Sequence, residues 1–497
     1  MLLKPKFVNY LALFAILFGI TIRFSQYLSN RSLWGDEASI ALNIVDRSYL
    51  ELLQPLDYNQ AAPPGFLWIE KLAVQLFGNN EYALRFFPLI AGIISLFALY
   101  ELAKKTVSVI AIPIALILLA SLKEPLYYAT EVKQYSSDIM VALLISLLLI
   151  PLQNKTLETS KIILISSLGI VAFWLSHPAI FVLAGIEIVS FILTPALRKK
   201  EILINRLPLY LIWIIGFIFL YFITLTNVAK NQNLHNAWKP EYPQSIFDFI
   251  WLIHSFIRFF NQPLGFKIMD EVAIVVFIIG TIIFLRKKKQ TFLILMSPLL
   301  VTLVAAYLHK YPFRSRLILF LTPFFILIIA EGTAFFFSHF TKPKKRIKIA
   351  GLIIATLLIF PPLIQSSVYF FHPETRHEIR PIIEYIKTNQ KPDDAIFLAG
   401  GSPDQFQYYA AKYGYSNSMY YILPYDDFFN PETFSEQTWE EIKRTTPQLQ
   451  NKQRVWFVVS GLKRAREVIV KSSLDRIGQK LDYFSKPGSL TYLYQLK

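Results

Sequence analysis

The feature that most constrains this chain is a series of apolar runs of roughly 17 to 22 residues, the length that a helix needs to cross a hydrocarbon core of ~30 Å. Charged residues make up only 17% of the sequence, against about 25% in soluble domains. A soluble enzyme and a disordered chain are therefore excluded, and the absence of cysteine excludes a disulfide scaffold. We predict a polytopic α-helical membrane protein with about eleven transmembrane helices, near residues 7–28, 82–102, 106–122, 136–152, 162–176, 178–197, 207–226, 270–285, 291–308, 317–337 and 349–370.

Lys and Arg residues outside these runs indicate the orientation of the chain. Short loops rich in Lys and Arg stay in the cytoplasm, so we expect a cytoplasmic N-terminus, a C-terminal part outside, and a location in the plasma membrane (the inner membrane of a bacterium). The net charge of +16 then reflects topology, and no nucleic-acid partner is expected. The basic loops lie at residues 4–6, 104–105, 155–161, 198–206, 286–289 and 342–348.

The chain divides by composition into two parts. Residues 1–370 are expected to form a transmembrane catalytic domain, whose first external loop covers about 29–80 and contains an interfacial helix near 65–77. Residues 371–497 are expected to form a small extracytoplasmic α/β domain, because strand and helix patterns alternate there. Strands are expected at 394–401 and 454–461, helices at 376–389, 403–413 and 462–477, and a hairpin at 480–496.

Two adjacent carboxylates, Asp36 and Glu37, follow the first predicted helix on its external side. Apolar neighbours such as Leu33 and Trp34 would partly desolvate them, and desolvation raises the pKa of a carboxyl group toward the range of a general base. The alternative is that the pair only caps a helix beginning at Ala38, because acidic residues stabilise the first turn of a helix. Spacing alone leaves both interpretations open.

Three arginines are expected at the same side of the membrane. Arg85 lies inside the outer end of the second predicted span, where an arginine either extends to the interface or binds an anion such as phosphate. Arg314 and Arg316 stand in a short external loop that is basic where the positive-inside rule disfavours basic residues. That loop either binds an anion or anchors the chain at the interface.

Two further external positions carry polar residues. Glu131, Lys133 and Tyr135 precede the fourth predicted helix, and His177 stands beside Pro178 between two predicted helices. The alternatives are a solvated ion pair for the first group and a structural role for the histidine. No group of histidines and carboxylates has the spacing of a zinc site, and no glycine-rich phosphate loop is present.

Several of these motifs together resemble the GT-C glycosyltransferases. The branch most similar contains the protein O-mannosyltransferases and the lipid A aminoarabinose transferase (glycosyltransferase family 39-like). The resemblance is close over residues 30–90 and looser over 120–320. The similar motifs are at residues 34–37, 62–65, 76–78, 83–85, 131–135 and 314–323.

This resemblance implies an inverting transfer of a sugar, hexose or pentose, from a polyprenyl-phosphate donor to an acceptor hydroxyl at the outer face of the membrane. Asp36 is the expected general base, with Glu37 positioning or replacing it. The acceptor is a lipid, a glycan or a protein, membrane lipids surround the enzyme, and no metal ion or other cofactor is expected. The residues expected to bind the donor and its phosphate are Arg85, Glu131, Lys133, Tyr135, His177, Arg314 and Arg316.

One position departs from the pattern of the family. Many relatives have Lys or His just before the Pro-Pro pair, where it is thought to meet the donor phosphate, whereas this chain has Ala62. The cation must then come from elsewhere, and Arg85, Lys133 and Arg316 are the candidates.

Three other functions remain as alternatives. A polysaccharide polymerase or ligase would use a polyprenyl-pyrophosphate donor, usually with large external loops rich in Arg and His. A non-enzymatic transporter of lipid-linked sugars would show charges at mid-membrane and repeated halves, which this sequence does not show. A non-catalytic scaffold that binds a partner through its tail would have no need of the acidic pair.

Overall fold

The computed structural model describes residues 5–338, 345–422, 440, 444, 452–461 and 464–496. The chain forms two compact units. The helical unit comprises Met1–Ser29 and Arg47–Pro373, and the α/β unit comprises Asn30–Asp46 and Glu374–Lys497. The sequence placed residues 30–46 in the membrane domain, whereas the structure groups them with residues 374–497, which are called the tail below.

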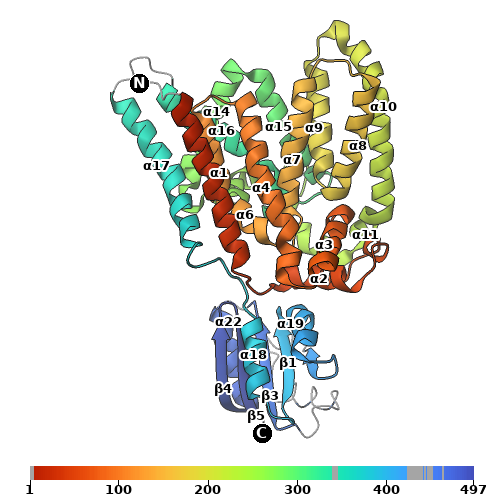
Figure 1. The fold of residues 1–497 in the computed structure, drawn as a ribbon, viewed down its shortest axis with the longest axis vertical. Helices are drawn as coiled ribbons and strands as arrows, with labels where there is room; N and C mark the ends of the chain where they lie inside the picture. The colour runs from red at the N-terminus through yellow and green to blue at the C-terminus, as the bar shows by residue number, and fades with distance from the viewer. Residues whose placement is uncertain are drawn as a thin grey trace. The chain divides into compact units, whose positions relative to one another are not determined.

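Eight helices of the described residues are long and apolar enough to cross a membrane. Neighbours pack along their lengths, for example α4 against α7 and α9 against α15 (Figure 1). Each span contains one of the following helices, lengthened in some cases by a short helical turn beside it: α1 (Pro5–Leu28), α4 (Glu81–Thr106), α7 (Tyr135–Leu149), α10 (Ala196–Leu220), α14 (Asp270–Lys287), α15 (Lys289–Tyr307), α16 (Thr322–Ser338) and α17 (Lys345–Val368).

Three further predicted runs fall on shorter apolar helices. Helices α8 (Thr159–Leu175) and α9 (Ala179–Leu193) have 17 and 15 residues. The predicted span at 106–122 falls on α5 (Ala111–Ser121), which ends at Leu122, where the chain bends by 61° into Lys123–Thr130. Every predicted run thus coincides with an apolar helix, and the polytopic helical fold is confirmed. The basic residues Lys4, Lys342 and Lys344 lie outside the described residues.

Small residues allow close contact between two of the long helices. A Cβ atom added to Gly280 of α14 would collide with the carbonyl oxygen of Ile328, and one added to Gly332 of α16 would collide with that of Val276. Such close backbone approach is typical of helix pairs in membranes, where small residues form the contact surface.

Shorter helices follow the first span and precede α14. Helix α3 (Pro64–Phe77) forms where the interfacial helix was predicted, with Pro64 at its first position, which suits the fixed φ of proline. A Cβ atom on Gly65 would lie 2.7 Å from the carbonyl oxygen of Trp174, so only glycine fits where α3 meets the end of α8. The remaining helical elements here include α2 (Gly35–Asp46), α11 (Thr226–Lys230), α12 (Gln232–Trp238) and α13 (Phe249–Phe259).

The described residues of the α/β unit form a five-stranded sheet in the order β2-β1-β3-β5-β4. Strand β1 pairs in parallel with β2 and β3, while β5 pairs antiparallel with β3 and β4. The sequence predicted β1, β3, the hairpin and the three helices, but not the three-residue β2. The elements are β1 (Ala395–Gly400), β2 (Tyr420–Ile422), β3 (Arg454–Ser460), β4 (Gly478–Lys486), β5 (Ser489–Leu496), α18 (Arg380–Asn389), α19 (Ser402–Ala410) and α22 (Arg464–Ile477).

Candidate active site

The acidic pair lies in the first turn of α2, which begins at Gly35 rather than at Ala38. Glu37 is fully buried, and its carboxylate accepts a hydrogen bond from the backbone N–H of Trp34 at 3.4 Å. This contact gives Glu37 a role in closing the first turn, as the capping interpretation requires. Asp36 is only partly buried, so it is the carboxylate of the pair with surface left exposed.

Residues of the tail surround the acidic pair within the α/β unit. The Arg376 guanidinium lies 4.2 Å from the centre of the Trp34 ring, and the His377 ring meets the same indole edge-on at 6.0 Å. The Ser39 hydroxyl, one turn beyond Asp36, donates a hydrogen bond to the Asp404 carboxylate.

The charges of this cluster act on one another. Burial raises the pKa of Asp404, and the negative charge of Asp36 raises it further, while the hydrogen bond from Ser39 opposes the shift. Burial and the charge of Arg376 lower the pKa of His377 to about 4, against the opposing effect of Asp36. The histidine is therefore neutral at neutral pH. Among the described residues, no group of three His, Asp or Glu side chains could hold a metal ion.

The second motif is buried in the helical unit. Glu131 and Lys133 are 0% and 4% exposed. The Lys133 ammonium donates to the Gln60 side-chain oxygen at 2.6 Å, and the Gln134 amide donates to the Ala61 carbonyl at 3.4 Å. The structure thus brings a lysine beside the segment that ends in Ala62, the position where many relatives carry their cation.

The late motif meets the second motif through Arg316. Its guanidinium lies 5.6 Å from the centre of the Tyr135 ring, within the range of a cation–π contact. Arg314 instead forms an ion pair with Glu241, which also binds Arg258 at 3.0 Å. Arg314 therefore shares one protein carboxylate with a second arginine.

His177 belongs to a buried polar cluster that the sequence interpretation missed in part. Burial lowers the pKa of His177 to about 4, which favours the neutral form of the ring. Its neighbour Ser176 interacts with Asp138, which is 3% exposed in the first turn of α7, and the charge of Asp138 acts on the Tyr311 hydroxyl. The sequence signal for Asp138 is its position as an acidic residue at the start of an apolar run, but the predicted motif ends at Tyr135.

Arg85 is 1% exposed near the start of α4. Its charge and that of the buried Glu70 both act on the Tyr27 hydroxyl of α1. The arginine and a buried carboxylate therefore both act on one tyrosine of α1, and a structural role for Arg85 is the alternative to phosphate binding.

A second buried arginine supports the bend after α5. The Arg23 guanidinium of α1 donates to the carbonyl oxygens of Leu119 and Ala120 at 3.1 and 3.4 Å. These carbonyls lie in the last turn of α5, where helical backbone partners are lacking. Arg23 therefore holds the point from which the chain turns toward Glu131 and Lys133.

We expect Arg23→Met to lower the free energy of unfolding by ~1.5–3 kcal/mol, because hydrogen bonds from a charged group are lost. Thermal unfolding in detergent measures this change. The matched variant Arg286→Met, at the exposed end of α14, should unfold like the wild type. Equal unfolding temperatures for both variants would show that Arg23 does not support the bend.

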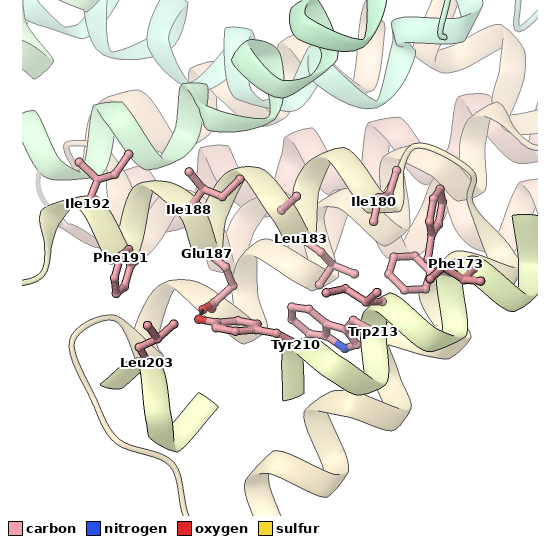
Figure 2. Close-up of a pocket in the computed structure, with 14 residues that line it drawn as sticks. Phe173, Ile180, Leu183, Glu187, Ile188, Phe191, Ile192, Leu203, Tyr210 and Trp213 are labelled. Atoms are coloured by element: carbon pink, nitrogen blue, oxygen red, sulfur yellow. Dashed lines mark hydrogen bonds between the residues drawn. The ribbon is translucent and has the colours of Figure 1, made fainter. Parts of the chain in front are cut away.

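A large apolar cavity of about 420 Å³ lies between α8, α9 and α10. Figure 2 shows Glu187 and Tyr210 side by side among its apolar lining, where the tyrosine hydroxyl donates to the carboxylate at 2.8 Å. None of the predicted site residues lines this cavity. Its lining therefore suits hydrocarbon rather than a sugar phosphate.

Comparisons with known proteins give the same fold. Residues 61–224 match the family described as dolichyl-phosphate-mannose-protein mannosyltransferase. A sequence comparison with curated proteins finds no significant match. ArnT from Cupriavidus metallidurans, solved with bound undecaprenyl phosphate, is similar at 12% identity with a TM-score of 0.54, over 99% of this chain and 98% of that one.

The archaeal oligosaccharyltransferase AglB from Archaeoglobus fulgidus, solved with an inhibitory peptide and a dolichol-phosphate, is also similar. Its TM-score is 0.52 at 11% identity, over 99% of this chain and 74% of that one. Both relatives are GT-C glycosyltransferases, and the likeness extends through the helical unit and the tail. The resemblance inferred from the short motifs is thereby confirmed, and this chain has the fold of the GT-C membrane glycosyltransferases.

Proposed function

We propose that this protein is an inverting glycosyltransferase that moves a sugar from a polyprenyl phosphate to an acceptor hydroxyl at the outer face of the membrane. The observation that carries the proposal is the partly exposed Asp36 at the start of α2, in a chain with the GT-C fold. The two similar structures that contain undecaprenyl phosphate and dolichol-phosphate support a lipid-phosphate donor.

The reaction is a single displacement. The acceptor oxygen attacks the anomeric carbon, its proton passes to Asp36, and the bond from the anomeric carbon to the lipid-phosphate oxygen breaks. A phosphate is already a good leaving group, so the chemistry requires one base and cations rather than the two carboxylates of most glycosidases.

Transfer by the purified protein tests the proposal. Polyprenyl-phosphate sugars labelled in the sugar should pass label to an acceptor fraction from the envelope, and mass spectrometry of lipids and glycans from cells with and without the protein should identify the acceptor. Polyprenyl-pyrophosphate donors serve as the comparison. Transfer only from the pyrophosphate donors would favour a polymerase or ligase, and movement of intact donor across vesicles without transfer would favour a transporter.

Lys133 is proposed to supply the phosphate cation in place of a residue at position 62, because its ammonium reaches Gln60 just before the Pro-Pro pair. We expect Lys133→Met to weaken donor binding roughly ten- to hundredfold, the value of a lost charge-assisted contact. Arg85→Ala should do the same if Arg85 also binds phosphate, and Arg85→Lys should restore only part if the contact is bidentate. Titration with a polyprenyl-phosphate sugar measures each affinity.

The donor affinities of Lys133→Met and Arg85→Ala decide the role of each residue. Unchanged donor affinity in folded Lys133→Met would contradict the assignment of that lysine. Unchanged affinity in Arg85→Ala, combined with a lower unfolding temperature, would instead show that Arg85 compensates the buried Glu70.

We also propose that the N-terminus faces the cytoplasm and the α/β unit faces the outside, as the basic loops indicate. Alkaline phosphatase, which is active only outside the cytoplasm, should be active when fused after Lys497. A fusion after Arg198, in a basic loop, should be inactive. An inactive C-terminal fusion with an active one at Arg198 would reverse the orientation.

A further inference from the structure

Side chains of the tail form hydrogen bonds with both the backbone N–H and the backbone carbonyl of Leu33. Its N–H donates to the Tyr409 hydroxyl at 2.9 Å, and its carbonyl accepts from the Gln405 side-chain amide at 2.8 Å. Tyr409 is fully buried and Gln405 has no exposed surface. Both residues lie on α19, so one helix fixes the chain three residues before Asp36.

Two more contacts fix the segment before and after the acidic pair. Ser32 bonds to the Glu378 carboxylate through its backbone N–H at 3.2 Å and through its hydroxyl at 2.9 Å. On the other side of Asp36, the Ser39 hydroxyl donates to the Asp404 carboxylate. The acidic pair is thus bracketed by side chains of the tail.

These contacts gather at the carboxyl ends of the parallel strands β1 and β3. Gln405 accepts a hydrogen bond from the hydroxyl of Ser460, the last residue of β3. A Cβ atom on Gly35 would lie 3.7 Å from the carbonyl oxygen of Gly401, which directly follows β1. In open α/β sheets this edge is the usual place for a bound ligand, and here the chain's own acidic segment occupies it.

We propose that the α/β unit positions the general base: it binds residues 32–39 as its ligand, and Tyr409 and Gln405 of α19 are the positioning residues. This inference rests on the role of Asp36 in the proposed function. Neither side chain is assigned contact with the substrate. They fix the backbone that carries Asp36, and catalytic groups must be held close to their productive geometry for full rate.

Tyr409→Phe tests the proposal with the smallest change, because it removes one hydroxyl and keeps the ring. We expect kcat at saturating donor and acceptor to fall about three- to tenfold, the value of one hydrogen bond, and donor affinity to stay unchanged. Tyr413→Phe is the matched control. It lies four residues on, and its hydroxyl bonds the exposed Glu384 carboxylate at 2.7 Å, so its kcat should equal that of the wild type.

A cross-link tests the docking directly, because the chain contains no cysteine. The side chains of Ser39 and Asp404 touch, so Ser39→Cys combined with Asp404→Cys should form a disulfide on oxidation. We expect the oxidised form to keep the kcat of its own reduced form, since the docked segment is the active arrangement.

Distinct results overturn distinct claims. Equal kcat in Tyr409→Phe and the wild type would overturn the positioning role, as would loss of activity on oxidation that a reductant reverses. A fall in donor affinity equal to the fall in kcat would show a general structural role instead. A wild-type protein that transfers no sugar from any donor would overturn both the proposed function and the positioning role. Formation of the disulfide would not rescue either claim.

Discussion

Asp36→Asn is expected to lower turnover by about 10²–10⁴-fold, the usual contribution of general base catalysis. Asparagine has nearly the shape of aspartate but cannot take a proton, so the fold and donor affinity should be preserved. Asp36 is partly exposed at the start of α2, which makes a local loss of packing small. The measurement is single-turnover transfer from a polyprenyl-phosphate sugar, with donor binding determined separately.

Glu37→Gln is the internal control for this variant. Glu37 is fully buried and accepts the Trp34 N–H, so a glutamine oxygen can accept the same bond and turnover should fall much less. Full turnover by Asp36→Asn would refute the assignment of the base. An inactive Glu37→Gln beside an active Asp36→Asn would exchange the two roles and keep the mechanism.

Arg206→Met is expected to lower the free energy of unfolding of the helical unit by ~3–5 kcal/mol, because it leaves the buried Glu187 carboxylate without its compensating positive charge. The Arg206 guanidinium donates to both oxygens of Glu187 at 2.9 and 2.7 Å, and to the Lys155 carbonyl at 2.9 Å. The side chains are 2% and 7% exposed. Equilibrium unfolding in mixed detergents measures the change.

Two further variants distinguish the loss of an ion pair from the cost of leaving an uncompensated charge in the interior. Arg198→Met removes the exposed contact to Glu201 on the same helix, and we expect at most about 0.5 kcal/mol. Arg206→Met combined with Glu187→Leu should recover much of the loss, because no unpaired charge remains in the interior. A single Arg206 variant as stable as the Arg198 variant would show that the buried pair is dispensable.

Local patterns in the sequence predict most of the fold. Apolar runs locate the helices because the membrane imposes a fixed length on each span. In the tail, glycine turns and apolar runs locate β1 and β3, and the turn at Pro487 locates the hairpin. The bend at Leu122 escaped prediction although Pro125 follows it, and proline cannot donate the hydrogen bond that a continuous helix would need there. Arg23 contacts the last turn of α5 at the same point.

The candidate site was predictable only in part. Residues 36–37 and 131–135 stand out as charges beside apolar runs. The structure shows in addition that a lysine of the second motif contacts Gln60, near the Pro-Pro pair. Asp138 was missed because an acid in the first turn of a helix is common. The contacts of Leu33 with Tyr409 span 376 residues, and no pattern in one sequence records a pairing at that distance.

The long separation between Leu33 and Tyr409 has a consequence for biosynthesis. At about 5–20 residues per second, roughly 20–75 s pass between synthesis of the acidic segment and synthesis of α19, which holds it. During that interval Leu33 lacks the hydrogen bonds that α19 provides. In a nascent chain the spans described above are therefore synthesised before the acidic segment can dock, and a helix made much later completes the surroundings of that segment.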